Sequence, residues 1–420
     1  MKTFSEMGLP ESLRHTLKHL NFVEPTPIQA KAIPIALKGN DILGSAQTGT
    51  GKTVAFAIPL IVNLYNKQNN TALVMTPTRE LASQVMSQFA SLLGKKTKIR
   101  SALLIGGDSM FKQLNQLKNK PRLIVGTPGR INDHLKRKSL QLDHLDFLVL
   151  DETDRMLDMG FSIQINEILK FAPNNRQTLL FSATLPNNII KISAKYMKDP
   201  VRVEVDKSLD KPLNIKQEVL YTGADKKYDH LKSEIDKRSG SIIIFAKTKS
   251  NTENIVKKLS KDGYDAYTLN GDLRQSVRTR IINNFRKMKF RILVATDVAS
   301  RGIDVPHIEH VINYNIPENP DDYIHRIGRT ARAGADGAAI IFITPSEKHK
   351  WIKMKGSLKL DVLDANALPE FEKKKEEGKK SDSSRKGKRR FFRKQNKKIH
   401  SQKRNRKKSK SNKNLSNLNQ

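Results

Sequence analysis

The sequence contains no cysteine and no long apolar run. The lack of cysteine excludes disulfide bonds, thiolate zinc sites and cysteine nucleophiles. The longest apolar run, residues 54–62, contains Pro59 and is far too short to span a bilayer. The first residues also lack the apolar stretch of a signal peptide. We therefore expect a soluble, cytoplasmic protein that does not bind a membrane.

Acidic residues are scarce. The 420 residues include 42 Asp+Glu against 77 Lys+Arg, which gives a formal net charge of +35. Such an excess predicts a polyanionic partner, and it favours nucleic acid over an anionic membrane surface.

About half of this charge lies at the C-terminal end. Residues 371–420 contain 21 Lys/Arg against 4 Asp/Glu and few large apolar side chains. Such a segment cannot bury enough surface to offset its ordering entropy, so we predict a disordered basic tail. We expect the tail to bind phosphate backbones, with Phe391 and Phe392 stacking on bases. A solubility tail and a nuclear-localisation signal are the alternatives.

Two series of short apolar strands alternate with polar loops and amphipathic segments. This alternation predicts an α/β fold with helices on both faces of parallel sheets. The polar, Pro-containing stretch 208–214 separates the series and is interpreted as a linker, so the predicted domains are 1–207 and 215–370. The predicted strands are 41–43, 72–75, 122–125, 147–150 and 178–181 in the first domain, and 241–245, 265–269, 291–295, 311–314 and 338–343 in the second.

A glycine-rich run, residues 46–53, follows the first predicted strand. Two glycines in it allow a tight turn whose N–H groups point at phosphate oxygens. Lys52 adds a charge for the β- and γ-phosphates, and Thr53 can bind Mg²⁺ where the next helix begins. The run departs from the usual phosphate-binding pattern because it starts with Ala46 instead of glycine. The predicted nucleotide contacts in this run are Gln47, Thr48, Gly49, Thr50, Gly51, Lys52 and Thr53.

Two carboxylates follow the apolar run 147–150. At the end of a buried strand, Asp151 is placed to bind Mg²⁺ and Glu152 is placed to polarise an attacking water. Either motif alone could be a turn or a helix cap. Together they indicate a nucleoside triphosphate hydrolase.

With these motifs and those that follow, residues 4–334 resemble a DEAD-box ATP-dependent RNA helicase of superfamily 2. The resemblance implies two tandem RecA-like domains. Residues 22–29, with Phe4 upstream, resemble the Q motif of that family, in which Gln29 would bond the adenine edge and Phe22 would stack on the base. An amide has one donor and one acceptor side, which suits adenine rather than guanine. The implied cofactors are therefore ATP and Mg²⁺.

The resemblance also implies how the ATP site is completed. Closure of the two domains would bring Arg329 and Arg332 to the γ-phosphate as arginine fingers. Asp304 would contact the ribose. The implied catalytic residues are Lys52, Asp151, Glu152, Arg329 and Arg332.

Further motifs match those that contact RNA or couple hydrolysis to strand separation in the family. Hydroxyls, backbone N–H groups and arginines at helix starts suit phosphates and 2′-hydroxyls. The implied RNA contacts are Pro77, Thr78, Arg79, Gly107, Thr127, Arg130, Gln275, Arg278 and Thr296. The implied coupling residues are Ser182, Thr184 and His325.

The chain departs from the family pattern at two positions. Thr153 replaces alanine in the tetrad 151–154, which leaves the carboxylates in place and puts the coupling to residues 182–184 in question. Ala331 replaces a glycine that is common at that point. These details, with the segment 155–161, favour the bacterial RhlE-like branch.

We therefore predict a monomeric ATP-dependent RNA helicase that unwinds short RNA duplexes with little sequence preference. Its protein partners would act on ribosomal precursors or in RNA decay. A DNA-directed superfamily-2 ATPase and an ATP-independent RNA annealer are the alternatives. Stimulation of ATP hydrolysis by RNA but not by DNA would separate the first from the helicase.

Overall fold

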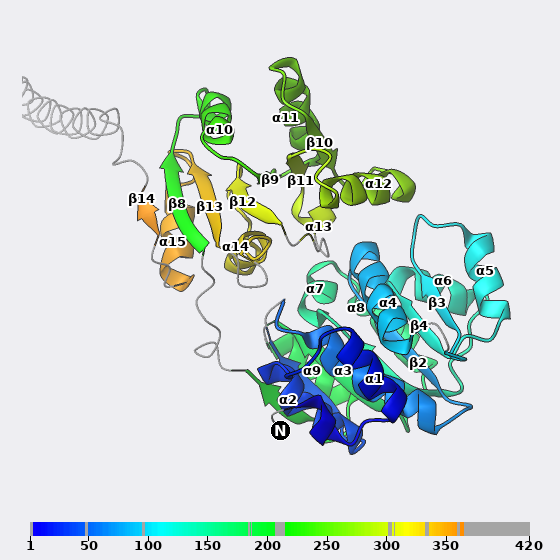
Figure 1. Cartoon of the computed structure of the whole chain (residues 1–420). Helices are drawn as coiled ribbons and strands as arrows, with labels where there is room; N and C mark the ends of the chain where they lie inside the picture. Colours follow the sequence, from blue (N-terminus) through cyan, green and yellow to red (C-terminus); the bar gives the residue numbers. More distant parts are fainter. Residues whose placement is uncertain are drawn as a thin grey trace, which may run out of the picture. The chain divides into compact units, whose positions relative to one another are not determined.

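The computed structural model describes residues 3–46, 49–94, 97–183, 185, 187–205, 215–300, 305, 307–331, 336–358 and 362–364. They form two parallel sheets flanked by helices (Figure 1). We call the described residues up to 205 lobe 1 and those from 215 onward lobe 2. Both sheets lie within the unit Met1–Leu363, except for Asp364, the last residue of the second sheet.

The sheet of lobe 1 has seven strands in the order β3-β4-β2-β5-β6-β1-β7, and every neighbouring pair is parallel. Its strands are β1 (Ile42–Ser45), β2 (Thr71–Met75), β3 (Ser101–Leu104), β4 (Leu123–Gly126), β5 (Leu145–Leu150), β6 (Gln177–Ser182) and β7 (Val201–Glu204). Its helices are the 3₁₀ turn η1 (Phe4–Met7), α1 (Glu11–His19), α2 (Pro27–Leu37), α3 (Lys52–Asn66), α4 (Arg79–Leu93), α5 (Met110–Lys118), α6 (Pro128–Lys136), α7 (Thr153–Asp158), α8 (Ser162–Lys170) and α9 (Asn187–Tyr196).

The sheet of lobe 2 has the order β10-β11-β9-β12-β13-β8-β14. The strands are β8 (Ile215–Tyr221), β9 (Ser241–Phe245), β10 (Ala266–Leu269), β11 (Ile292–Ala295), β12 (Ile308–Asn313), β13 (Gly337–Ile343) and β14 (Leu363–Asp364). The helices are α10 (Lys227–Asp236), α11 (Lys249–Lys261), α12 (Gln275–Arg286), α13 (Asp297–Ser300), α14 (Pro320–Ile327) and α15 (Lys348–Leu358).

The predicted fold class is confirmed, since each lobe is a parallel sheet with helices packed against it. The ten predicted strands correspond to β1, β2, β4, β5 and β6 in lobe 1 and to β9–β13 in lobe 2. The sequence missed β3, β7, β8 and β14. The edge strand β7 exposes three of its four residues, so it lacks the continuous apolar run of a central parallel strand. The predicted linker 208–214 and tail 371–420 lie outside the described residues, and the domain limits stay predictions.

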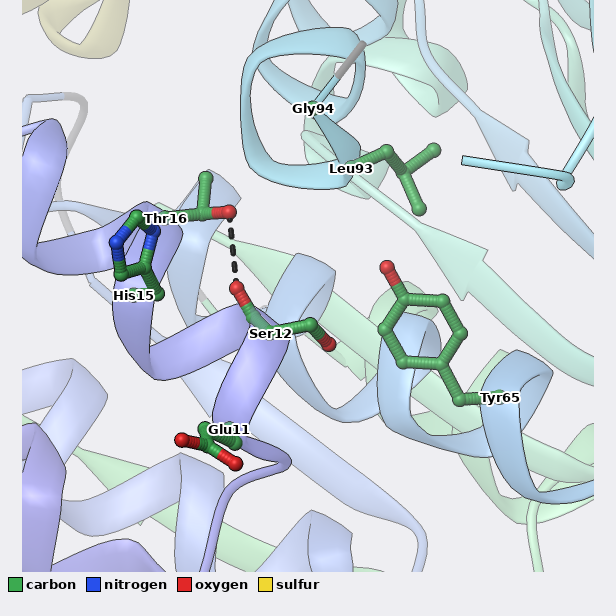
Figure 2. A pocket seen from close by; sticks show the side chains of 7 residues that line it. All are labelled: Glu11, Ser12, His15, Thr16, Tyr65, Leu93 and Gly94. Atoms are coloured by element: carbon green, nitrogen blue, oxygen red, sulfur yellow. Dashed lines mark hydrogen bonds between the residues drawn. The ribbon is translucent and has the colours of Figure 1, made fainter. Parts of the chain in front are cut away.

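Lobe 1 has a pocket of about 510 Å³ beside the C-terminal ends of α3 and α4. Side chains of α1, α3 and α4 surround it (Figure 2). The pocket lies at the opposite end of α3 from the glycine-rich run. It is lined by Glu11, Ser12, His15, Thr16, Tyr65, Leu93 and Gly94.

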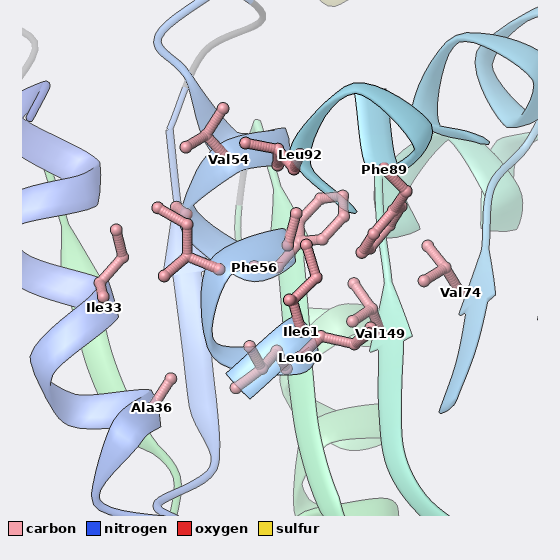
Figure 3. Close-up of a cluster of buried hydrophobic side chains, with 14 of the residues drawn as sticks. Ile33, Ala36, Val54, Phe56, Leu60, Ile61, Val74, Phe89, Leu92 and Val149 are labelled. Atoms are coloured by element: carbon pink, nitrogen blue, oxygen red, sulfur yellow. The ribbon is translucent and has the colours of Figure 1, made fainter. Parts of the chain in front are cut away.

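The apolar run 54–62 forms the buried middle of α3. This helix packs against α2, α4 and the sheet, so apolar side chains are needed all around it. Phe56 contacts the ring of Phe89 at a centroid distance of 6.2 Å (Figure 3). It also contacts the ring of Phe181, at 5.8 Å. None of the helices in the described residues is long and apolar enough to cross a bilayer.

Gly44 in β1 makes room for this aromatic cluster. A Cβ atom at Gly44 would lie 2.6 Å from two ring carbons of Phe181, which is fully buried. We predict that Gly44→Ala lowers the free energy of unfolding by about 1–3 kcal/mol, because the ring cannot move without displacing its neighbours. Thermal unfolding measures this. Gly356→Ala is the control, since its Cβ would meet no atom within 4 Å and a helical position favours alanine. Equal stability of the two variants would contradict the packing argument.

Candidate nucleotide and RNA sites

The glycine-rich run connects the end of β1 to the start of α3 at Lys52. Gly49 and Gly51 have φ values of 90° and 91°, in the left-handed region that favours glycine. A Cβ atom at Gly51 would also lie 2.4 Å from Gln29 Nε2. Both the backbone and the close approach therefore require glycine at residue 51. The turn leaves the N-terminal amides of α3 at the end of the loop, where they suit an anion.

Gln29 ties α2 to this loop. Its Nε2 donates to the Gly51 carbonyl and its Oε1 accepts from the Thr26 amide, both at 3.0 Å. The side chain is 2% exposed. Phe22 is half-buried and meets Phe4 edge-on, with ring centroids 6.4 Å apart. The sequence predicted an adenine contact for Gln29 and did not anticipate that the same amide supports the phosphate loop.

Lys52 and Asp151 place opposite charges at one site. Lys52 Nζ donates to the Ala46 carbonyl at 2.9 Å, and the side chain is buried. Asp151 is 3% exposed and accepts a hydrogen bond from the Glu152 amide at 3.0 Å. Burial raises the pKa of Asp151 to about 7; Lys52 opposes this shift, and the charge of Glu152 adds to it.

The tetrad 151–154 turns sharply from β5 into α7. Glu152 has a φ of 50°, a left-handed conformation that is strained for a residue with a side chain and that recurs at functional sites. Thr153 is fully buried, and its hydroxyl donates to the Leu150 carbonyl at 3.2 Å. Asp154 Oδ2 accepts from the Ala183 amide at 3.1 Å. This last bond joins the tetrad to the predicted coupling segment.

Arg79 lies against a pair of glycines. A Cβ atom at Gly107 would be 2.4 Å from Arg79 Nη1, and Gly107 has a φ of 77°. Burial lowers the pKa of Arg79 from its usual value. The preceding Thr78 caps α4 by accepting from the Leu81 amide at 3.2 Å. The first turn of α4 therefore presents a guanidinium held in place by backbone.

Four side chains join the start of α4 in lobe 1 to the start of α12 in lobe 2. Glu80 Oε1 lies 2.7 Å from Arg278 Nη2, and both residues are buried. Arg79 Nη1 donates to Gln275 Oε1 at 3.3 Å. Arg278 Nε also donates to Glu80 Oε1, at 2.9 Å, while Nη1 and Nη2 donate to backbone carbonyls of lobe 2. The sequence analysis did not predict Glu80 as a site residue. The feature that could have indicated it is its position directly after Arg79, a predicted RNA contact.

A second buried ion pair crosses between the lobes. Arg155 Nη1 in α7 lies 2.7 Å from Asp322 Oδ1 in α14, and Arg155 is 2% exposed. Within lobe 2, Arg326 forms a two-pronged pair with Asp297 at 2.6 and 2.7 Å and lies over the Phe245 ring. The sequence analysis did not predict these four charged residues as part of a site, because the two partners of each pair are distant in the chain.

Several of the other predicted residues in the described part of the chain lie at or close to the ends of helices and strands. Pro77 and Thr127 are buried at the starts of α4 and α6, and Thr296 is 8% exposed between β11 and α13. Arg329 is 7% exposed after α14, and His325 Nδ1 lies 2.5 Å from the Asp321 carbonyl. The predicted residues outside the described part are Gln47, Thr48, Thr184, Asp304 and Arg332.

Arg130 contacts the segment that precedes α5. Its Nη2 donates to the Asp108 carbonyl at 3.5 Å, and its Nη1 lies 3.7 Å from Asp133 Oδ2. It is therefore close to the glycine pair against which Arg79 lies.

Comparison with protein families finds two matching models. Residues 26–192 match the DEAD/DEAH box helicase model, and residues 226–334 match the helicase conserved C-terminal domain. The chain is 44% identical to the ATP-dependent RNA helicase CshA of Listeria monocytogenes over 83% of this chain and 67% of that protein. It is 44% identical to the ATP-dependent rRNA helicase RRP3 of Yarrowia lipolytica over 86% of this chain and 76% of that protein.

Solved structures agree with these relatives. Dbp5 of S. cerevisiae bound to RNA and ADP BeF3 has a TM-score of 0.79 and 31% identity, covering 90% of this chain and 99% of that one. Mss116p bound to single-stranded RNA and AMP-PNP has a TM-score of 0.78 and 31% identity, covering 86% and 78%. The placement in the RhlE-like branch stays a prediction, since the relatives reported above are named CshA and RRP3.

Proposed function

The chain belongs to the DEAD-box family of ATP-dependent RNA helicases, and we propose that it works by closing its two lobes on ATP and RNA together. It hydrolyses ATP and acts on RNA. The observation that carries the proposed mechanism is the placement of Lys52, Asp151 and Glu152 around one site at the ends of β1 and β5.

We assign the phosphates of ATP to the loop between β1 and α3. The amides of the loop and of the start of α3, with Lys52, would bind the β- and γ-phosphates. Glu152, held next to Asp151 by the strained turn, would orient and deprotonate the attacking water. Arg329 and Arg332 would offset charge that develops on the γ-phosphate. Gln29 and Phe22 would select adenine at the rim of this site.

The residues present also fit Mg²⁺. Thr53 and Asp151 supply the oxygen ligands that Mg²⁺ prefers, and it is commonly held by one or two carboxylates together with substrate phosphates. In the part of the chain that the structure describes, no group of three or more His, Asp or Glu side chains could hold a metal alone. When bound, Mg²⁺ would neutralise phosphate charge during transfer.

RNA would bind across the starts of α4, α6 and α12. Contacts to phosphates and 2′-hydroxyls carry little base information, so we propose low sequence preference in the two lobes. Because ATP and RNA would each bridge the lobes, each would favour closure and raise the affinity for the other. The neighbouring structures bound to both RNA and a nucleotide analogue support this arrangement.

We also propose a cytoplasmic monomer that acts with partners on ribosomal precursors or in RNA decay. The relative named as an rRNA helicase supports the first of these substrates.

Glu152→Gln tests the hydrolytic assignment. We predict a fall in ATP turnover of about 10²–10⁴-fold, because the amide cannot accept the proton of the attacking water. RNA binding in the presence of ATP should persist. Steady-state ATPase assays and RNA-binding titrations measure the two effects, and unchanged turnover would remove Glu152 from the mechanism.

The DNA-directed alternative is tested by measuring ATP hydrolysis with RNA and DNA strands of one sequence. Equal stimulation by DNA would favour that alternative.

Glu80→Gln tests closure. It leaves Arg278 buried without its counter-charge whenever the lobes meet, so the mutual enhancement of ATP and RNA binding should fall about tenfold. Binding of RNA with and without an ATP analogue measures this coupling. The matched control is Glu167→Gln, since the partners of Glu167, Asn132 and Lys136, lie in the same lobe. Equal coupling in both variants would exclude the Glu80–Arg278 pair from the closed state.

Ser182→Ala tests the coupling segment. Among the described residues, the buried Ser182 hydroxyl has no hydrogen-bond partner, so its loss should change stability by less than about 1 kcal/mol. We predict fewer unwinding events per ATP hydrolysed. The control is Ser193→Ala, because the Ser193 hydroxyl donates to the Ile190 carbonyl at 2.9 Å. That variant should lose stability and keep its coupling; the reverse pattern would contradict the assignment.

A further inference from the structure

The exposed side of α12 and the turn that follows it carry positive charge outside the site described above. Residues 275–291 contain no Asp or Glu and six Lys/Arg, of which one, the buried Arg278, belongs to that site. Ser276, Arg280, Asn283 and Lys287 are exposed, and their spacing puts them on one helical face. Arg280, Lys287 and Lys289 have no ion-pair partner among the described residues. Positive charge on this face is therefore left for a ligand.

An exposed aromatic ring lies beside this charge. Tyr267, in the edge strand β10, is 43% exposed and packs on Phe290 with ring centroids 4.3 Å apart. Phe290 in turn stacks on the fully buried Phe285 at 5.4 Å. The Tyr267 hydroxyl makes no hydrogen bond within the described part of the chain. The ring is thus held from below by the core while much of its surface faces solvent.

The turn after α12 presents its side chains outward at a cost in backbone strain. The Met288 amide donates to the Phe285 carbonyl and the Lys289 amide to the Asn284 carbonyl, at 2.9 and 3.0 Å. This is a Schellman turn, whose left-handed position is usually glycine. Here it is Met288, with a φ of 55° and 62% exposure. Its apolar side chain is mostly outside the core, so packing in the described structure does not account for it.

From this combination we infer a second RNA-contact surface on lobe 2, the α12 surface, formed by Tyr267, Arg280, Lys287, Met288 and Lys289. Single-stranded RNA is bound by basic grooves with aromatic platforms on which bases stack. The α12 surface has both parts, with Tyr267 as the platform. Single exposed aromatic side chains are common and by themselves indicate no function. Here the ring lies beside cations that have no ion-pair partner among the described residues, and beside a strained, exposed methionine.

The position of α12 indicates which part of the RNA is bound. The helix begins at Gln275, a proposed RNA contact, and its 12 residues make it about 18 Å long. Phe290, on which Tyr267 packs, follows its C-terminal end. The inference rests on that proposed site, because the α12 surface would hold the RNA that continues beyond it. A strand that fills only the site between the lobes would not reach Tyr267, whereas a longer strand would.

The test compares short and extended RNA strands on the full chain with a non-hydrolysable ATP analogue. One strand is just long enough to saturate RNA-stimulated ATPase; the others carry single-stranded extensions at either end. The extension should tighten binding, and Tyr267→Leu should lower that gain by about 5- to 150-fold, the range for loss of one stacked base. Tyr267→Phe should retain the gain, since stacking needs the ring and the hydroxyl bonds to no residue that the structure describes. The C-terminal tail is present in every variant, so its contribution cancels.

Charge is tested separately with Lys287→Gln/Lys289→Gln. For the extended strand, this variant should reduce the slope of log Kd against log salt by about 1.4, which is two phosphate contacts on single-stranded RNA. The matched control is Lys118→Gln/Lys120→Gln. These lysines have the same spacing at the end of α5, both are exposed, and Lys120 has a φ of 51°. The control should leave the slope for the extension unchanged.

The outcomes are distinguishable. Thermal unfolding identifies any variant that fails to fold, and Tyr267→Phe provides a ring-conserving comparison. Failure of wild-type protein to bind the short strand would overturn the proposed function itself. If the short strand binds normally and the Tyr267 and lysine variants bind extended RNA as wild type does, the α12 surface is not an RNA site. Loss of binding to an acidic, Phe-containing peptide in those same variants would then assign it to a protein partner.

Discussion

Lobe 1 buries a carboxylate, Asp151, at the end of β5, and most of the local structure around the nucleotide site follows from that. A buried carboxylate is strongly disfavoured in its charged form unless cations or hydrogen-bond donors face it. Lys52 and the Glu152 amide offset this penalty in part, and the pKa of Asp151 stays raised, at about 7. Lys52 is in turn placed by the left-handed turn at Gly51, whose carbonyl is bound by Gln29. The strained backbone of Glu152 is part of the same arrangement, because its amide points back at Asp151.

The same electrostatic constraint acts between the lobes. In each of the pairs Glu80–Arg278 and Arg155–Asp322, one residue comes from each lobe, and both partners are buried. Separation of the lobes would return these charges to water, so the Coulombic gain on closure is largely offset by desolvation. Pairs of this kind fix the alignment of two surfaces more than they hold them together. Because the gain and the cost of closure are nearly equal, ligands that bridge the lobes, as ATP and RNA would, easily shift the equilibrium between open and closed lobes.

The parts of the fold and of the site that depend on neighbouring residues could be predicted from the sequence. The turn at Gly49 and Gly51 and the strand before Asp151 are signalled by neighbouring residues, since glycines at left-handed positions and apolar central strands have strong local patterns. The edge strand β7 was missed because it is mostly exposed. The partners of Glu80 and Arg155 were missed for a different reason: each lies more than a hundred residues away, and no local pattern pairs them.

Thr153 is a residue whose role could not be predicted from its neighbours in the sequence. Threonine replaces the alanine of the family pattern here, and the added hydroxyl raised the question of how the carboxylates of the tetrad connect to residues 182–184. In the structure the hydroxyl donates to the Leu150 carbonyl three residues earlier, a local bond of the kind that serine and threonine side chains make to nearby backbone. The connection to β6 is made by Asp154, which accepts from the Ala183 amide. Thr153 therefore bears on the packing beneath α7, while the link between the tetrad and the coupling segment runs through its neighbour.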